Sequence, residues 1–263
     1  MRVLDINFVI YCEHVASLPK VYELVTIYAP YFANTLILLN VPSRTTLPIL
    51  YPEHMSSIRV LQMPDRLSTG AALNKMFAHL FGGKIFLIDS RSILKKEILQ
   101  YLENSLLWNF ELTETIVSFQ SQPRYEQLHS ANRIGNNWNT DFQFVTTLCW
   151  GALLFDQQFV IEIGAFAHCL SEDALTVDLS WRAQKSIGIL LQSIESVVTL
   201  DDYYAPVRSE WSFLRKHYPD LYPDWMHFMR RSYQWVITSL PTMDTSIQSS
   251  KDLSATSTEL SLN

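Results

Sequence analysis

The sequence predicts an α/β protein whose mostly parallel β-sheet is covered by helices on both faces. Over residues 7–88, short apolar runs alternate with longer runs of helical spacing in the order β-α-β-loop-β-α-β, which is the pattern of a parallel sheet. The 263 residues are 48% hydrophobic and only 17% charged. The chain therefore has enough apolar side chains for a full core and too little charge for a disordered protein.

The first half of the chain carries most of this regular pattern. Residues 7–12 are a continuous apolar run, typical of a strand that is buried on both faces. A helix follows from Ser17, has Pro19 in its first turn and ends at Pro30, as the usual start and stop signals predict. Further strands are predicted at 35–39, 58–63 and 84–88, and a second helix at 68–80.

The second half alternates less regularly. Ser171 is a predicted helix N-cap, followed by Glu172 and Asp173 in the first turn, where carboxylates interact favourably with the helix dipole. In chain order we expect a helix at 92–107, a strand at 115–120, a polar loop at 123–141, a strand at 142–155, a helix at 157–163, a helix at 171–186, a strand within 189–198 and an aromatic-rich helical region at 203–236. Beyond Pro241 the chain is rich in Ser and Thr, which predicts a disordered tail.

Composition excludes several classes of protein. Lys and Arg number 20 against 26 Asp and Glu, a formal net charge of −6. A nucleic-acid-binding protein normally carries a basic surface, so we expect no nucleic-acid partner. Only 7 glycines are present, and no glycine-rich phosphate loop is formed. The 3 cysteines are far apart in the chain, which suits reduced thiols better than a disulfide framework. No apolar run approaches the ~18 residues that span a membrane. We therefore expect a cytoplasmic protein.

Polar residues follow several of the predicted strands. Glu13 and His14 come after the first strand, Asn40 after the second, and Asp89-Ser90-Arg91 after the fourth. In an open α/β sheet the ligand binds beyond the carboxyl ends of the strands. These residues are therefore the first candidates for a binding site.

Three stretches together resemble the GT-A fold glycosyltransferases of family 2. They are residues 68–91, with Asn74, a glycine turn and a strand that leads to Asp89; residues 150–166, which begin Trp-Gly-Ala; and residues 171–183, which contain Glu172-Asp173. The resemblance covers roughly residues 7–200. It implies a GT-A domain with a nucleotide-binding half at 1–95 and an acceptor-side half at 96–202. An aromatic-rich C-terminal helical region at 203–240 and a disordered tail at 241–263 follow.

The resemblance also implies roles for particular residues. Asp173 matches the catalytic base of the family, but an insertion of about three residues leaves Asp178 as the alternative. The residues implied on the donor side are Glu13, Asn40, Asn74, Asp89 and Arg91, and those implied on the acceptor side are Trp150, Gly151, Glu172 and Trp181.

Two departures from the family pattern bear on the chemistry. The family's Asp-x-Asp motif is degenerate here, because Arg91 stands where the second carboxylate is expected. A carboxylate beside a guanidinium pairs with it sooner than it binds a metal, so Mg²⁺ or Mn²⁺ is disfavoured and Asp89 is the only candidate ligand. Arg91, with Arg208, Arg215 or Lys216, is then the candidate counter-charge for a diphosphate. The family's His after the strand that follows the base helix is missing at 197–201.

The resemblance implies a glycosyltransferase of the hexosyltransferase type that moves a sugar from a nucleotide-sugar donor to a glycan or glycoconjugate acceptor. It implies inverting transfer, in polysaccharide biosynthesis, and the cation at Arg91 favours a reaction without metal. The alternative is a catalytically degenerate module that binds a glycan or a partner protein. For the region 203–236 three roles stay open: a lid on the sheet, a carbohydrate platform, or a patch for the inner face of the membrane.

Overall fold

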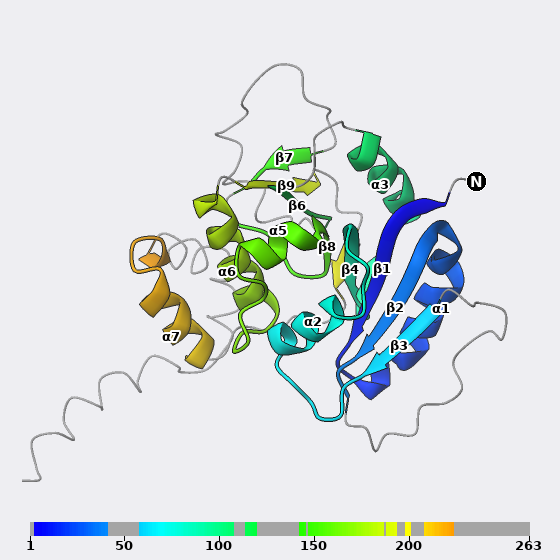
Figure 1. The fold of residues 1–263 in the computed structure, drawn as a ribbon, viewed down its shortest axis with the longest axis horizontal. Coiled ribbons are helices and arrows are strands. Elements are labelled where there is room, and N and C mark those ends of the chain that lie inside the picture. Colours follow the sequence, from blue (N-terminus) through cyan, green and yellow to red (C-terminus); the bar gives the residue numbers. More distant parts are fainter. Residues whose placement is uncertain are drawn as a thin grey trace, which may run out of the picture. The chain divides into compact units, whose positions relative to one another are not determined.

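Figure 1 shows the fold of the protein in a computed structural model, which describes residues 3–41, 58–107, 114–119, 142–145, 147–186, 188–193, 198–200 and 208–223. The chain divides into two compact units, Met1–His217 and Tyr218–Asn263. Every helix and strand named below belongs to the first unit. None of the helices within the described ranges is long and apolar enough to cross a membrane.

A mixed sheet of eight described strands lies at the centre of the first unit, in the order β3-β2-β1-β4-β8-β6-β9-β7. Four of its seven strand pairings are parallel. The strands are β1 (Leu4–Cys12), β2 (Phe32–Leu39), β3 (Ile58–Gln62), β4 (Lys84–Asp89), β6 (Thr115–Ser118), β7 (Phe142–Phe144), β8 (Ala152–Asp156) and β9 (Ile189–Ser193). A second, antiparallel pair joins β5 (Ser92–Leu94) to β10 (Val198–Leu200).

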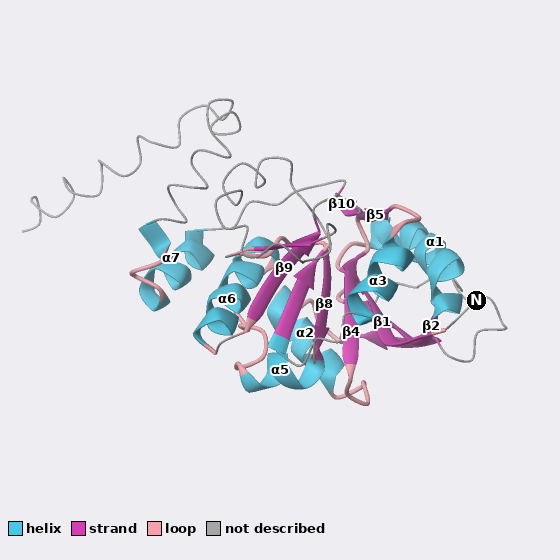
Figure 2. Ribbon diagram, turned by 90° about the horizontal axis from the view of Figure 1, so that it is seen from above, coloured by secondary structure: helices cyan, strands magenta, loops and turns pink. Residues whose placement is uncertain are grey.

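Helices cover both faces of this sheet (Figure 2). On one face, α1 (Leu18–Tyr28) and α3 (Ile98–Leu107) pack against strand residues such as Phe8 and Phe86. On the other face lie α2 (Thr69–Phe77), α5 (Gln157–Glu162) and α6 (Glu172–Lys185), which contact β2, β8 and β9 respectively. Single 3₁₀ turns at Val15–Ser17 and Ala29–Tyr31 flank α1, and α7 (Arg208–His217) packs on α6.

The central strands carry long apolar runs because they are covered on both faces. In β1, Phe8, Val9, Ile10, Tyr11 and Cys12 are all fully buried. Phe8 stacks on the rings of Phe32 and Phe86 at centroid distances of 4.5 Å and 5.8 Å. The predicted fold class, a mostly parallel sheet with helices on both faces, is confirmed.

The structure corrects two predicted elements and confirms a third. The predicted helix at 92–107 is wrong at its start, because 92–94 form β5 and the helix begins at Ile98. The predicted strand at 142–155 is two strands, which pair with different neighbours: β7 with β9, and β8 with β4 and β6. Gly151, with a φ of 126°, directly precedes β8. The strand predicted within 189–198 is found as β9.

Three other predictions fall wholly or partly outside the described residues. The polar loop at 123–141 and the tail at 241–263 lie outside them completely. Within 203–236 the structure describes 208–223, where α7 is helical as predicted.

Candidate functional site

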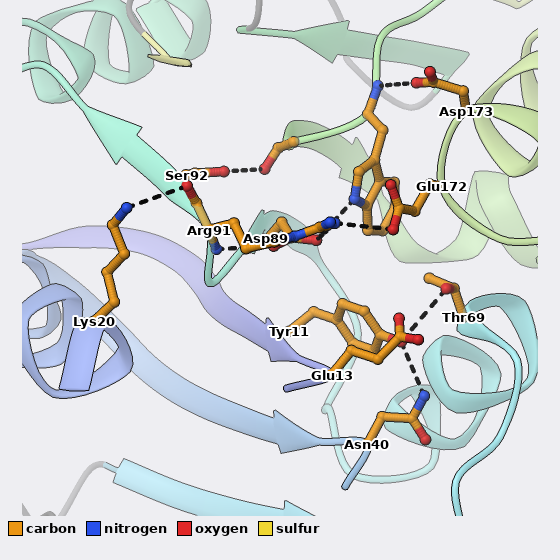
Figure 3. Close-up of polar contacts among 12 residues, drawn as sticks. Tyr11, Glu13, Lys20, Asn40, Thr69, Asp89, Arg91, Ser92, Glu172 and Asp173 are labelled. Atoms are coloured by element: carbon orange, nitrogen blue, oxygen red, sulfur yellow. Dashed lines mark hydrogen bonds and ion pairs between the residues drawn. The ribbon is translucent and has the colours of Figure 1, made fainter. Parts of the chain in front are cut away.

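A group of mostly charged side chains meets where β1 and β4 end and α6 begins (Figure 3). We call this group the strand-end cluster. Asp89 is the last residue of β4, Arg91 lies in the turn that follows, and Trp150 precedes β8. Glu172 and Asp173 are the first two residues of α6. The cluster therefore consists of Asp89, Arg91, Trp150, Glu172 and Asp173.

Asp89 and Arg91 form a two-pronged ion pair inside this cluster. Arg91 Nε donates to Asp89 Oδ1 (2.9 Å) and Arg91 Nη2 to Asp89 Oδ2 (2.7 Å), while the Arg91 backbone N–H donates to Oδ1 (2.8 Å). Both side chains are buried, with exposed fractions of 7% for Arg91 and 3% for Asp89. Burial alone would lower the pKa of the guanidinium, but Asp89, and after it Glu172, raise that pKa above its ordinary value. The guanidinium therefore stays protonated, and Asp89 fixes its orientation.

Glu172 is the second carboxylate that contacts Arg91. Its Oε1 lies 3.0 Å from Arg91 Nη2. Burial, reinforced by the charges of Asp89 and Asp173 and opposed by Arg91, raises the pKa of Glu172 to about 8. Its backbone φ is +44°, a left-handed conformation that residues with a side chain adopt at some energetic cost. A strained residue with a perturbed carboxyl group is typical of a functional site.

Trp150 links Asp89 to Asp173. Its indole Nε1–H donates to Asp89 Oδ2 (2.9 Å), and its backbone N–H donates to Asp173 Oδ1 over a longer distance of 3.4 Å. The two carboxylates that the sequence analysis assigned to opposite halves of the domain are therefore bridged by one residue. The ring of Trp150 also meets Tyr11 edge-on at a centroid distance of 6.1 Å.

Asp178, the alternative base, lies in a different environment. Its Oδ2 accepts from Arg182 Nη2 (2.6 Å) and Nε (3.0 Å), and Arg182 Nη1 in turn donates to the carbonyl of Ile163 (2.7 Å). Of the two aspartates, the structure brings Asp173 into the strand-end cluster and pairs Asp178 with Arg182, one turn along the same helix.

A second polar group lies beside the cluster, at the ends of β1 and β2. The Tyr11 hydroxyl donates to Glu13 Oε2 (2.9 Å), accepts from Asn40 Nδ2 (2.9 Å) and lies 3.4 Å from Thr69 Oγ1. Burial and the neighbouring charge of Glu13 raise the pKa of Tyr11, so this hydroxyl stays protonated. Glu13 also pairs with Arg66, which is 54% exposed.

Asn40 and Asn74, both predicted to contact the donor, each hold a distant backbone residue. Asn40 donates to the carbonyl of Leu67 (2.8 Å) and accepts from its N–H (2.9 Å). Asn74 does the same with Phe166, at 2.7 Å and 2.9 Å. We call these two contacts the amide clamps. Since an amide side chain offers one acceptor and two donors, and Asn40 is fully buried, its described hydrogen bonds fasten the chain ahead of α2.

The Asn74 clamp is part of a longer seam between α2 and the segment 163–171 that leads to α6. Ser68 donates to the carbonyl of His168, and the Gly70 N–H to that of Leu170 (3.0 Å). A Cβ at position 70 would lie 2.0 Å from the carbonyl oxygen of Ala167, so the contact requires glycine. The seam places the first turn of α6, with Glu172 and Asp173, against the strand ends.

The structure gives the remaining predicted residues more distant or backbone roles. The Gly151 carbonyl accepts from the Asp89 N–H (2.8 Å) and from Ser92 Oγ (2.9 Å), which fastens the end of β4 to the start of β8. Trp181 is buried eight residues after Asp173, roughly 12 Å along the helix. Arg208, Arg215 and Lys216 are exposed side chains of α7.

Sequence reasoning missed several participants. Tyr11, Thr69 and Arg66 belong to the polar group at the strand ends through contacts with partners 29 to 58 residues away in the chain. No local sequence pattern predicts such contacts. Lys20 of α1, which donates to the Arg91 carbonyl (3.4 Å), was also missed. A signal did exist for Tyr11, because it lies in the last two residues of a predicted buried strand, just before the polar residues Glu13 and His14.

A divalent metal, which the family resemblance implies, does not fit at Asp89. Its two oxygens accept four hydrogen bonds, three from Arg91 and one from Trp150, and a carboxylate has about four acceptor positions. The adjacent guanidinium would also repel a cation. In the part of the chain that the structure describes, no group of three or more His, Cys, Asp or Glu residues is arranged to hold a metal ion.

No protein-family model matches the chain, and no curated protein sequence matches it. Solved structures do match. One is GalNAc-T7 with UDP, GalNAc and Mn²⁺, at 11% identity and a TM-score of 0.59, covering 95% of this chain and 54% of that one. Another is the mannosyltransferase PcManGT from Pyrobaculum calidifontis with GDP-Man and Mn²⁺, at 11% identity and a TM-score of 0.58. The match covers 97% of this chain and 81% of that one.

A third match is S. aureus TarS with UDP-GlcNAc, at 12% identity and a TM-score of 0.52, covering 81% of this chain and 65% of that one. These three proteins are GT-A glycosyltransferases. The chain has a GT-A fold. At 11–12% identity the matches establish the fold alone, and the chain spans about half the length of GalNAc-T7.

Proposed function

We propose that this protein is a glycosyltransferase that moves a sugar from a nucleotide-sugar donor to a glycan or glycoconjugate acceptor. The GT-A fold, shared with proteins solved with UDP, GDP-Man and UDP-GlcNAc, supports this reaction class. In this proposal residues 1–95 are the donor-binding half and residues 96–202 the acceptor-side half. Assembly of a polysaccharide or glycoconjugate at the cytoplasmic face of a membrane is the setting.

One observation carries the proposal: Arg91, Glu172 and Asp173 meet at the carboxyl ends of the strands, beside Asp89. This is the edge where open α/β sheets bind ligands. Sugar transfer needs a positive charge for the departing diphosphate and a base for the acceptor hydroxyl. Here a guanidinium and a carboxylate are the groups available for those two tasks.

Arg91 supplies the positive charge in place of a metal. Asp89 holds the guanidinium by two bonds and leaves its orientation fixed, and a planar guanidinium suits the oxygens of a diphosphate. The contact with Glu172 is a single one of 3.0 Å, which makes it the contact that a diphosphate displaces. A carboxyl group with a raised pKa leaves at lower cost because it can leave in its neutral form.

Asp173 acts as the base. The acceptor hydroxyl oxygen forms a bond to the anomeric carbon as the bond from that carbon to the diphosphate breaks, and the hydroxyl proton passes to the Asp173 carboxylate. Attack opposite the leaving group inverts the configuration at that carbon. Trp150 and Glu172 stand on the acceptor side of the reacting atoms, and Glu13, with Tyr11, stands on the donor side. The amide clamps of Asn40 and Asn74 position the backbone around them.

A donor panel tests the proposal. The protein is incubated with UDP-GlcNAc, GDP-Man and related nucleotide sugars, once with Mn²⁺ and once with EDTA, and release of the nucleoside diphosphate is measured. Turnover of at least one donor in EDTA is expected, with loss of turnover but retention of donor binding in the Asp173→Asn variant. Turnover that requires Mn²⁺, or full turnover by Asp173→Asn, would contradict the assigned roles.

A second candidate function is a catalytically degenerate module that binds a glycan or a partner protein. The observation that favours it is the saturation of Asp89, whose oxygens are all engaged within the protein. The same panel separates the two candidates, since a degenerate module binds a nucleotide sugar or a glycan without release of the nucleoside diphosphate.

A further inference from the structure

The start of α6 is held from outside the helix. Ser171, the N-cap residue, makes no side-chain hydrogen bond to the first turn, although serine is a residue type that often does so. Its own backbone N–H instead donates to Glu210 Oε1 of α7, at 2.7 Å. A residue 39 positions away in the chain therefore fixes the point at which α6 begins.

Glu210 is the acidic residue of a helix whose other charges face outward. It is buried, with 5% of its surface exposed, whereas Arg208, Arg215, Lys216 and His217 of the same helix are exposed. A carboxylate is costly to bury unless it is hydrogen-bonded. Its place beside the N-terminus of α6 provides both a backbone donor and the positive end of a helix dipole.

The residue fixed by Glu210 directly precedes the two carboxylates of the strand-end cluster. Glu172 has a left-handed φ of +44°, and its side chain contacts Arg91. Asp173, the next residue, accepts from the Trp150 N–H. A strained conformation persists only where its surroundings impose it. The bond from the Ser171 N–H to Glu210 is one contact that holds the backbone on the N-terminal side of Glu172.

We propose that Glu210 is a positioning residue of the site: through the Ser171 N–H it holds the first turn of α6 so that Glu172 reaches Arg91 and Asp173 reaches Trp150. The positioning of these two carboxylates follows from the contacts alone, whereas its consequence for sugar transfer rests on the proposed function. In this role α7 positions residues of the site, in addition to packing on α6.

The test uses two substitutions that differ in one property. Glu210→Gln keeps an oxygen that accepts from Ser171, and Glu210→Leu keeps the buried volume but removes the acceptor. Loss of the acceptor for one backbone N–H lowers stability, and circular dichroism checks that the Leu variant is folded. Leu214→Ala is the matched control, because it weakens the packing of α7 through a buried side chain and leaves the Glu210 acceptor in place.

The first readout is independent of any reaction. In ¹⁵N NMR spectra, the Arg91 Nε–H and Trp150 indole N–H signals report on the strand-end cluster. We expect both to shift in Glu210→Leu and to keep their wild-type positions in Glu210→Gln and Leu214→Ala. Unchanged signals in Glu210→Leu, or equal shifts in Leu214→Ala, would overturn the inference, since Glu210 would then only attach α7.

The second readout is kinetic. With a donor that the wild-type protein turns over, Glu210→Leu is expected to lower kcat on the order of tenfold, because small misplacements of reacting groups are costly, and to leave the KM for the donor nearly unchanged. Glu210→Gln is expected to keep a kcat close to that of the wild-type protein. If the wild-type protein turns over no donor, the proposed function fails while the NMR comparison still decides the role of Glu210. A wild-type kcat in Glu210→Leu would contradict the catalytic consequence.

Discussion

The two amide clamps and the strand-end cluster both join distant segments of the chain, the clamps through neutral groups and the cluster through charged ones. Each joins segments that are far apart in the chain at one edge of the sheet. The clamps use a neutral side chain that meets the donor and the acceptor of a single backbone residue, Leu67 or Phe166. The cluster uses Arg91 against Asp89 and Glu172, with Asp173 on the Trp150 N–H and a strained backbone at Glu172.

The difference indicates which contacts serve the fold and which serve a ligand. In a clamp the amide nitrogen and the amide oxygen each have a backbone partner, and no charged group takes part. In the cluster, burial, together with the charges of Asp89 and Asp173, raises the pKa of Glu172 although Arg91 lies beside it, so this carboxyl group costs free energy to keep charged. Proteins keep such arrangements where chemistry or binding requires them. The neutral contacts should therefore set stability alone, and the charged ones both stability and function.

The largest effect is expected from the loss of Arg91. Arg91→Met leaves Asp89 and Glu172 buried without their cation, which should cost about 3–5 kcal/mol of unfolding free energy. Urea unfolding of the variant and the wild-type protein measures this loss. The double variant Arg91→Met/Asp89→Leu is the control and should recover more than half of the loss, because it removes the stranded charge as well. A loss of under about 1 kcal/mol in the single variant would show that the ion pair is not desolvated.

A pH dependence of stability should come from Glu172. Its pKa is raised from 4.5 to about 8 on folding, so between these values the folded state holds a proton that the unfolded chain releases. Stability therefore falls as pH rises through this window, by an amount on the order of 3 kcal/mol for this group.

The variant Glu172→Gln sharpens this comparison. It carries no titrating group, so the fall in stability from about pH 5 to about pH 8 should become shallower, as measured by urea unfolding across that range. Asn40→Ala is the control and should keep the wild-type slope, since its clamp is neutral. An equally steep slope in Glu172→Gln would mean that this carboxyl group titrates normally in the folded state.

A substitution in the seam should act through shape alone. Gly70→Ala places a Cβ 2.0 Å from the Ala167 carbonyl oxygen, and relief of that overlap should cost about 2–3 kcal/mol. Gly82→Ala is the matched control, because its φ is +86° but a Cβ there has open space, so only about 1 kcal/mol of backbone strain is expected. Thermal unfolding compares them, and equal losses would contradict a close contact at Gly70.

The smallest effect in this series belongs to the clamp at Asn40. Asn40→Ala leaves the Leu67 N–H and carbonyl without this partner and should cost about 2 kcal/mol. Because the clamp is neutral, the loss should be the same at low and high pH and should leave donor binding within about threefold of wild type. Loss of donor binding out of proportion to stability would instead assign Asn40 a direct contact with the donor.

Local patterns predicted the parts of the molecule that local forces determine. The apolar run of β1, the proline and glycine signals around α1 and α2, and the acidic start of α6 are all found where the sequence places them. The pairing of Arg91 with Asp89 was also predictable, because the residues are two positions apart. The i,i+4 spacing of Asp178 and Arg182 was a signal that would have separated Asp178 from Asp173.

What escaped prediction depends on partners that no local pattern specifies. Asn74 was singled out as a donor contact, yet its partner Phe166 lies 92 residues along the chain. The predicted strand at 142–155 is divided because β7 pairs with β9, and β8 with β4 and β6. The bond between Ser171 and Glu210 joins two helices across 39 residues. Each of these contacts forms only when the whole sheet and its helices are assembled.

The most direct test of the central claim, that Arg91 takes the place of a metal in donor binding, is a calorimetric titration of the protein with UDP and with GDP in EDTA. We expect saturable binding of at least one nucleotide, the same affinity after Mn²⁺ is added in place of EDTA, and weakening of about tenfold or more in Arg91→Lys, since an ammonium lacks the planar fork of a guanidinium. Binding that appears only with Mn²⁺, or wild-type affinity in Arg91→Lys, would contradict the claim.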